Sequence, residues 1–415
     1  MTGPGVHFLD DEEIACVVEV LRSRQLSRYR FKGEGEAQTS YSNVSKFEAE
    51  MAGQLGVPHA IAMNSGTSAL LSALVAAGVG PGDEVIVPGY TFVATMSAIV
   101  HARAIPVLAE IDESLNIDPQ DVRRRITPAT KAVIAVHMLG APCEMDALKA
   151  LCHEHGLVLI EDVAQAGGGT YKGKALGSWG TAGAFSLNVF KTFTAGDGGL
   201  LTTSDPELYR RAFGFHDQGF EPERAGVRPA PDLPFGLNLK MAELVGAVAY
   251  VQATKLPRIL EATRTRKRAF LNDIGDIPGA RERAIHDRDG DCGTVITYLF
   301  DDPRQAHTFA EALGCRVLIE TGRHHYAKME ALMNRQAWNG KGCPFDCPSH
   351  PTTRSYSQSD LPHTDDILGR AVALSVGVSD SYLGPGFGVT PMSSPAEIKT
   401  IADELRERVS TRMGW

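Results

Sequence analysis

Residues 60–70 read Ala60-Ile61-Ala62-Met63-Asn64-Ser65-Gly66-Thr67-Ser68-Ala69-Leu70, an apolar run followed by small polar residues and then by the start of an amphipathic segment. The run from Ala60 to Met63 has the length and composition of a buried strand. The segment from Thr67 to Ala77 places Leu70 and Leu74 on one helical face and ends at Gly78. A strand, a turn and a helix are therefore expected in this order.

The same alternation of apolar runs and longer amphipathic stretches continues to residue 203. Such runs are typical of parallel strands that crossover helices bury on both faces. The further strand candidates are Val85 to Val87, Pro106 to Ala109, Ala132 to Val136, Leu157 to Ile160, Ala182 to Leu187 and Leu200 to Thr203. The sequence thus predicts an α/β fold in which a mostly parallel sheet carries helices on both faces.

The chain has 415 residues, more than one compact core usually organises. Beyond the first 260 residues the alternation weakens, although a strand-like run and a helix-like segment still follow each other. We therefore expect a large domain at 25–255 and a smaller α+β domain at 256–415, the latter joined by an N-terminal helix over 9–22. The expected strand and helix of the smaller domain are Thr294 to Phe300 and Gln305 to Leu313.

Composition argues against several classes of partner. The formal net charge of −9 disfavours a general polyanion binder, because phosphate backbones recruit dense Lys and Arg surfaces. The one basic cluster, Arg264 to Arg268, is interpreted as the solvated face of a helix. No stretch approaches the ~20 apolar residues that span a bilayer, and the first residues do not resemble a secretory signal. We expect no nucleic acid or membrane partner and a cytoplasmic location.

Seven cysteines are scattered along the chain, which fits reduced thiols better than a disulfide framework. Cys343 and Cys347 are the one close pair. They lie in residues 340–360, which are rich in Pro, Ser, Thr and Gly and are expected to form a long loop. No second Cys or His cluster lies nearby at zinc-finger spacing. The pair is therefore interpreted as two loop thiols, and no metal site is predicted.

Two polar segments at strand ends are candidates for a ligand site. In the turn from Asn64 to Ser68, N–H groups at a helix start favour an anion such as phosphate, although simple helix capping explains the same residues. Glu161-Asp162 ends another apolar run, and since adjacent strand residues face opposite sides, only one carboxylate can point into a site. A buried carboxylate needs a cationic or protonated partner, which a pyridinium nitrogen would provide. A helix-capping or metal-binding acid is the alternative.

Lys191 follows the predicted strand at 182–187. An isolated lysine is usually a solvated surface residue. However, a phosphate-type turn, a strand-end Asp162 and then Lys191 would together hold the phosphate, ring nitrogen and aldehyde carbon of one cofactor. Phe92, after another strand, has the position to stack on a flat ring, although an aromatic residue there is more often core. His137 and His216 are interpreted as structural histidines.

In their order along the chain, these motifs resemble the sugar aminotransferases of the StrS/DegT type, which are pyridoxal phosphate (PLP) enzymes of fold type I. The resemblance runs from about Leu9 to Leu260 and continues more loosely to the C-terminus. It is carried by the motifs at 64–70, 82–88, 91–95 and 161–166, and by Lys191 ahead of Gly196-Asp197-Gly198-Gly199. It implies an aminotransferase that moves an amino group from glutamate or glutamine to the ketone of a small sugar, cyclitol or related intermediate.

The resemblance also assigns roles to individual residues. Lys191 would be the Schiff-base lysine, and Asp162 would pair with the pyridinium nitrogen. Gln165 would lie near the phenolic oxygen and Phe92 would stack on the ring. The phosphate would be held by Gly66, Thr67 and Ser186, and by Asn238 of the neighbouring subunit. A homodimer with shared active sites is implied.

Departures from the family pattern concern the substrate. Asn188 is nearer to the Gln of members that act on cyclitol ketones than to the His of many nucleotide-sugar members, and Asp197 replaces the usual Glu. The candidate substrate residues are Asn188, Arg323, His324 and Tyr326. The alternatives are a PLP-dependent dehydratase or cyclising synthase on the same scaffold and a non-catalytic PLP-binding regulator. Some relatives that remove a hydroxyl carry His at the lysine position, so Lys191 favours transamination.

Overall fold

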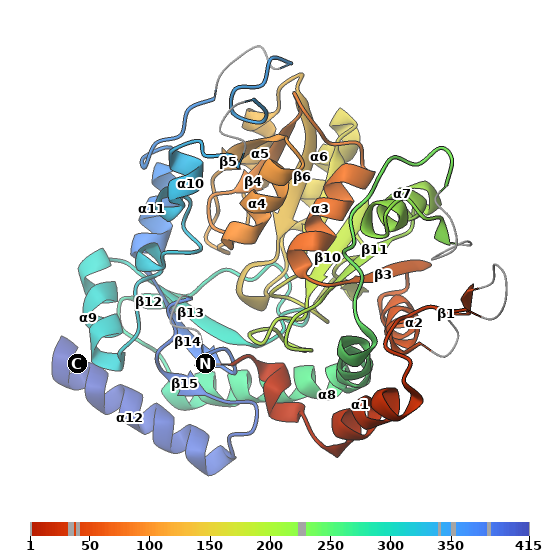
Figure 1. The fold of residues 1–415 in the computed structure, drawn as a ribbon. Coiled ribbons are helices and arrows are strands. Elements are labelled where there is room, and N and C mark those ends of the chain that lie inside the picture. The colour runs from red at the N-terminus through yellow and green to blue at the C-terminus, as the bar shows by residue number, and fades with distance from the viewer. Residues whose placement is uncertain are drawn as a thin grey trace.

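The computed structural model describes residues 2–31, 37–38, 42–222, 230–338, 342–349, 354–379 and 383–414. Figure 1 shows a larger and a smaller sheet with the long helix α8 (Glu243–Ile274) running across the view below them. Within the described ranges, no helix is long and apolar enough to cross a membrane. The described residues 342–349 and 354–360 contain no helix or strand, as expected for a long loop. The other residues of the predicted loop lie outside the described ones.

The larger sheet has seven strands in the order β3-β11-β10-β7-β6-β4-β5. β11 pairs antiparallel with both of its neighbours, and the remaining pairings are parallel. The strands are β3 (His59–Met63), β4 (Glu84–Pro88), β5 (Ile105–Ala109), β6 (Thr130–Val136), β7 (Val158–Asp162), β10 (Ala182–Ser186) and β11 (Gly199–Thr203). Every strand expected between residues 60 and 203 is present, and the prediction of a mostly parallel α/β sheet is confirmed.

Helices cover both faces of this sheet because successive strand residues point into two different cores. In β6, for example, Ile134 belongs to one core and Val133 to the other. The first core is closed by α3 (Gly66–Ala76), α4 (Val93–His101) and α7 (Pro206–His216). The second is closed by α2 (Asn43–Leu55), α5 (Pro119–Arg125), α6 (Met145–His155) and the first half of α8.

The smaller sheet follows the order β12-β13-β14-β15 and has a core of its own. Its strands are β12 (Ala280–Glu282), β13 (Val295–Phe300), β14 (Ala371–Val376) and β15 (Gly388–Val389). Phe270 of α8, Phe309 of α9 (Pro303–Leu313) and Leu405 of α12 (Pro395–Met413) pack against it, which gives the expected α+β arrangement. The short elements are η1 (Pro4–Phe8), η2 (Met138–Gly140), η4 (Leu318–Glu320), η5 (Tyr326–Lys328), α10 (Glu330–Met333), α11 (Pro362–Gly369), and the paired strands β1 (Arg30–Phe31) with β2 (Ala37–Gln38) and β8 (Thr170–Tyr171) with β9 (Lys174–Ala175).

Helix α8 runs through the predicted domain boundary at residue 255, so the two sheets share one helix. The N-terminal helix α1 (Asp11–Ser23) packs on the first half of α8. There Glu13 accepts hydrogen bonds from Gln252 at 2.9 Å and from Lys255 at 2.7 Å. The division of the chain into 25–255 and 256–415 stays a prediction.

Two local expectations were wrong. Cys343 and Cys347 form a disulfide rather than two free thiols, because the chain between them turns back and brings their Cα atoms within 4.1 Å. The expectation of a solvated basic face on α8 fails at Lys267, whereas Arg268 is exposed as expected. Lys267 is buried and pairs with Asp291 at 2.6 Å and Glu282 at 3.1 Å, because this part of α8 packs against the smaller sheet.

Candidate functional site

A cavity of about 380 Å³ lies at the carboxyl ends of the central strands, where the two sheets meet. This edge is where open α/β sheets bind ligands, because strand ends and helix starts converge there. The larger sheet contributes residues such as Val136 and Asp162, and the smaller sheet contributes Thr294 and Val295. The predicted site residues that line the cavity are Gly66, Thr67, Phe92, Asp162, Gln165, Ser186, Asn188, Lys191, Arg323 and His324.

The turn after β3 forms one end of the cavity. The Ser65 hydroxyl caps α3 by accepting a hydrogen bond from the Ser68 N–H at 3.1 Å. The N–H groups of Gly66 and Thr67 come first in α3 and have no intrahelical acceptor, so they could bind an anion placed in the cavity. A Cβ on Gly66 would lie 2.8 Å from the Cβ of Ser186, so glycine permits the close approach of β10. The turn and Ser186 form a cradle that fits a phosphate group.

Asp162 ends β7 with its carboxylate facing the cavity, and it is only 4% exposed. Its Oδ2 accepts a hydrogen bond from the Thr95 hydroxyl at 2.8 Å, and its Oδ1 accepts one from the Ala164 N–H at 3.1 Å. Burial raises the pKa of this carboxyl group, and the two hydrogen bonds oppose that shift. A cation placed in the cavity against Asp162 would offset the unfavourable burial. The arrangement fits a protonated ring nitrogen.

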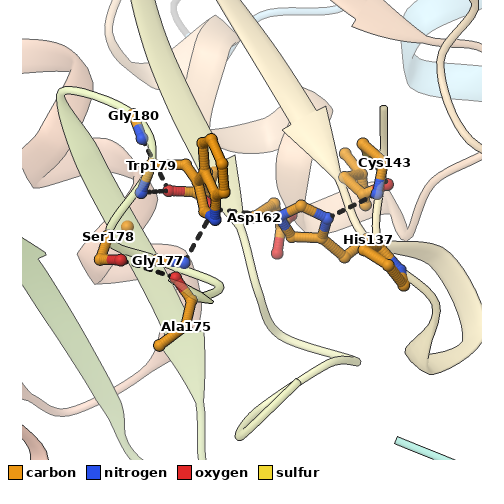
Figure 2. Close-up of polar contacts among 12 residues, drawn as sticks. His137, Cys143, Asp162, Ala175, Gly177, Ser178, Trp179 and Gly180 are labelled. Carbon is orange, nitrogen blue, oxygen red and sulfur yellow. Dashed lines mark hydrogen bonds and ion pairs between the residues drawn. The ribbon is translucent and has the colours of Figure 1, made fainter. Parts of the chain in front are cut away.

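Glu161 does not line the cavity and has its partners elsewhere. Its carboxylate accepts hydrogen bonds from the N–H groups of Gly177 at 2.8 Å, Trp179 at 2.7 Å and Gly180 at 2.8 Å. Figure 2 labels these three donor residues and the neighbouring pair of His137 and Cys143. It also contacts Nε2 of His137 at 3.3 Å, while Nδ1 of His137 accepts from the Cys143 N–H at 3.0 Å. The expectation that only one of the two carboxylates faces the site is therefore confirmed. His137 is a satisfied structural histidine.

Lys191 lies in the loop after β10, with its Nζ 5.9 Å from the centroid of the Phe92 ring. The backbone of this loop is supported by the N-terminal segment, which the sequence did not indicate. The Gly3 N–H donates to the Val189 carbonyl at 2.8 Å, and the Gly5 N–H donates to the Lys191 carbonyl at 3.4 Å. Residues at the start of the chain therefore help to place the candidate cofactor lysine.

Gln165 lines the cavity and is oriented by a backbone group. Its Oε1 accepts a hydrogen bond from the Leu139 N–H at 2.8 Å. Because an N–H group only donates, the amide oxygen is held at Leu139, and the NH₂ group is the donor end of the side chain. Sequence reasoning assigned no role to Leu139 or to Thr95. Thr95 had a detectable signal, since it stands one helical turn after Thr91 in a motif of the resemblance.

Asn188 and Asp197, which both depart from the family pattern near the lysine, contact each other. Asn188 Nδ2 donates to Asp197 Oδ1 at 2.9 Å, and both residues line the cavity. Arg323 and His324 reach the cavity because their backbone pairs with the segment that carries Phe92. The Thr91 N–H donates to the His324 carbonyl at 2.9 Å and the Val93 N–H to the Arg323 carbonyl at 3.1 Å.

Two predicted residues lie elsewhere. Tyr326 is fully buried at the start of η5, and its hydroxyl donates to Asp365 at 3.1 Å and accepts from the Leu361 N–H at 3.0 Å. The turn into η5 directs this ring into the core, so the structure does not bring Tyr326 to the cavity. Asn238 is exposed in the segment before α8, where its backbone pairs with Asp217. Its predicted contact is with a neighbouring subunit and stays a prediction.

The chain matches the DegT/DnrJ/EryC1/StrS aminotransferase family over residues 9–379, and it belongs to this family. Over 236 residues it is 39% identical to GDP-perosamine synthase of Vibrio cholerae, which covers 57% of this chain and 63% of that protein. Over 267 residues it is 43% identical to L-glutamine:2-deoxy-scyllo-inosose aminotransferase of Streptomyces kanamyceticus, which covers 62% of each chain. The crystal structure of 3-amino-5-hydroxybenzoic acid synthase matches 97% of both chains with a TM-score of 0.77 and 25% identity.

These comparisons confirm the resemblance read from the motifs and the α/β fold, which is that of the fold type I PLP enzymes. The chain covers less than two thirds of the length of the curated relatives quoted above.

Proposed function

We propose that this protein is a PLP-dependent aminotransferase that transfers an amino group from glutamate or glutamine to the ketone of a small sugar, cyclitol or related intermediate. The observation that carries the proposal is the convergence of Lys191, the buried Asp162 and the phosphate-type cradle on one cavity. Membership of an aminotransferase family and similarity to enzymes named for sugar and cyclitol amination support it.

The residues of the cavity fit PLP group by group. Gly66, Thr67 and Ser186 would hold its phosphate, Phe92 would cover one face of its ring, and Gln165 would donate to its phenolic oxygen. When bound, PLP supplies a ring that accepts electrons from the bonds of the reacting carbon. Asp162 would keep the proton on the ring nitrogen, because a cation stabilises a buried carboxylate.

Lys191 has two successive tasks in this proposal. Its Nζ would hold the aldehyde carbon of the cofactor. As a free amine, the same Nζ would move a proton to and from the reacting carbon of the donor and of the acceptor. Arg323, at the rim of the same cavity, is proposed to hold a carboxylate of the amino donor, because a guanidinium group binds carboxylates with two parallel hydrogen bonds.

We also propose a homodimer in which Asn238 reaches the cavity of the second copy. The segment that carries Asn238 exposes Phe235 by 98% and Leu237 by 49%, and such apolar residues favour burial against another chain. A cytoplasmic location is proposed as well. Five cysteines carry no disulfide, which suits a reducing compartment, and the Cys343–Cys347 bond is the exception.

A single-turnover assay tests the proposed function. Protein loaded with PLP and given glutamate or glutamine is expected to release one equivalent of 2-oxo acid per site. Keto sugars, keto-cyclitols and nucleotide-linked keto sugars are then supplied with isotope-labelled donor, and a product in which labelled nitrogen replaces the ketone oxygen is expected. Release of 2-oxo acid with loss of a hydroxyl and no nitrogen transfer would instead indicate a dehydratase. PLP-loaded protein that releases no 2-oxo acid from either donor contradicts the proposal.

A further inference from the structure

Arg283 is a buried cation that the proposed chemistry does not use. It follows β12, is 1% exposed, and forms no ion pair with a carboxylate among the described residues. Its Nη1 donates to the carbonyls of Ser114 at 3.1 Å and Met138 at 3.0 Å, and its Nη2 donates to the carbonyl of Leu139 at 3.0 Å. Burial lowers the pKa of this guanidinium group and the nearby negative charge of Asp291 opposes that shift, while the three carbonyls are its hydrogen-bond partners.

The carbonyls of Met138 and Leu139 belong to η2, the turn that follows β6 and borders the cavity. Leu139 has a φ of 55°, a left-handed conformation that residues other than glycine rarely adopt and keep only where their surroundings hold them. Arg283 reaches this turn from the smaller sheet. It therefore fixes a strained part of the cavity wall from the other half of the molecule.

The planarity of one peptide bond links Arg283 to Gln165. The carbonyl of Met138 and the N–H of Leu139 belong to the same trans peptide, so they point in opposite directions. Arg283 binds the carbonyl, and Gln165 Oε1 accepts from the N–H at 2.8 Å. Holding one end of this peptide unit therefore sets the direction of the other end.

We propose that Arg283 is a positioning residue that, through the Met138–Leu139 peptide, turns the NH₂ group of Gln165 toward the cavity as a donor to the phenolic oxygen of PLP. The last step rests on the proposed function, whereas the chain of contacts from Arg283 to Gln165 does not. A hydrogen-bond donor at the phenolic oxygen stabilises the ionised form of that oxygen. It thereby lowers the pH midpoint at which the linkage between the lysine and the cofactor loses its proton. Removal of the donor is expected to raise that pH midpoint by about one unit.

The test follows the visible absorption of PLP-loaded protein as a function of pH. Arg283→Met and Gln165→Ala are each expected to raise the midpoint by about one unit, and the double variant is expected to match Gln165→Ala alone. The control is Arg370→Met, which removes an arginine next to the smaller sheet, directly before β14. Its Nη1 also donates to a carbonyl, that of Phe300, at 2.9 Å. This variant should leave the midpoint unchanged. An unchanged midpoint in Arg283→Met, or a double variant that shifts by the sum of the singles, overturns the proposal.

A second measurement uses cofactor-free protein and Arg283→Lys, which keeps the charge but cannot span three carbonyls. In Arg283→Lys, the Leu139 amide is expected to exchange its hydrogen about tenfold faster than in the unaltered protein. In Arg370→Met, the exchange rate of this amide should not change. Equal exchange in Arg283→Lys overturns the proposal even if Arg283→Met does not fold. Failure of the chain to bind PLP would contradict the proposed function but would leave this exchange result intact.

Discussion

The two walls of the cavity are held in different ways. In the wall from the larger sheet, polar side chains already have protein partners, as in the contact of Asp162 with Thr95 and the contact of Gln165 with Leu139. The second wall is a patch of Thr294, Val295, Val378 and Leu383 from the second half of the chain, three of which are apolar. The polar Arg323 and His324 come from the same half, but their backbone pairs with the segment that carries Phe92. Polar groups that are already oriented suit a cofactor that always needs the same hydrogen bonds. An apolar wall selects a ligand mainly by how well its shape fits. Changes in the first wall should therefore alter cofactor chemistry, and changes in the second should alter which acceptor fits.

The largest effect is expected from Lys191→Ala. The variant loses the amine that holds the cofactor and moves the proton, so the rate of 2-oxo acid release should fall at least about a thousandfold. Single-turnover assays with glutamate and glutamine measure this. Lys174→Ala, at an exposed lysine of the same half of the chain, serves as the control and should keep full activity. A Lys191→Ala protein that retains the rate of the control would refute the assigned role.

Asp162→Asn should separate stability from function. Burial raises the folded-state pKa of Asp162 above its ordinary value of 3.8, so the folded protein binds this proton more tightly than the unfolded chain does. The contribution of Asp162 to the free energy of unfolding is therefore greatest below the pKa that this group has in the unfolded chain. It declines as the pH rises through the pKa that the group has in the folded protein. Asn cannot ionise, so the cofactor-free variant should unfold about 2 °C higher at neutral pH.

The same variant should show no gain in Tm at a pH below about 3.8, where the aspartic acid is also neutral. With PLP bound, Asp162→Asn should lose about a hundredfold in rate, because the ring nitrogen no longer has an anionic partner. Thermal unfolding at both pH values and the single-turnover assay measure these effects. A Tm gain of equal size at both pH values would show that ionisation is not the cause.

Gly3→Ala tests the support of the lysine loop by the N-terminal segment. A Cβ at position 3 would lie 2.2 Å from the backbone carbon of Phe190, next to Lys191, so the loop must shift. We expect PLP to bind about tenfold more weakly, since a displaced lysine no longer meets the cofactor aldehyde in the right geometry. Titration of cofactor-free protein with PLP measures this. Gly53→Ala, where a Cβ meets nothing within 4 Å, is the control, and equal affinity of the two variants would exclude the supporting role.

The smallest effect is expected from Val378→Ala in the apolar wall. PLP binding and the half-reaction with the donor should stay unchanged, while KM for the acceptor should rise a few-fold because apolar contact is lost. Steady-state kinetics measure KM with the keto compound that accepts nitrogen in the single-turnover assay. A titration with PLP measures the affinity for the cofactor. Weakened PLP binding in this variant would contradict the proposal that the second wall affects only the acceptor.

The first wall could be predicted from the sequence because its residues lie in local motifs at strand ends. The turn at 64–68 and Asp162 at the end of β7 carry their own signals of strand, turn and helix start. The second wall could not, because Thr294 and Val378 meet the cavity only after the smaller sheet has packed against the larger one. For Tyr326, membership of a motif did not predict where the side chain lies. Its neighbours Arg323 and His324 line the cavity, whereas the turn into η5 buries the ring of Tyr326.

The central claim is that Lys191 holds the cofactor, and borohydride reduction of PLP-loaded protein followed by peptide mapping tests it most directly. Reduction makes the lysine–cofactor bond permanent, so the account predicts a pyridoxyl adduct on the peptide that contains residue 191 and its absence in Lys191→Ala. An adduct on another lysine, or none in protein that has been supplied with PLP, would contradict it.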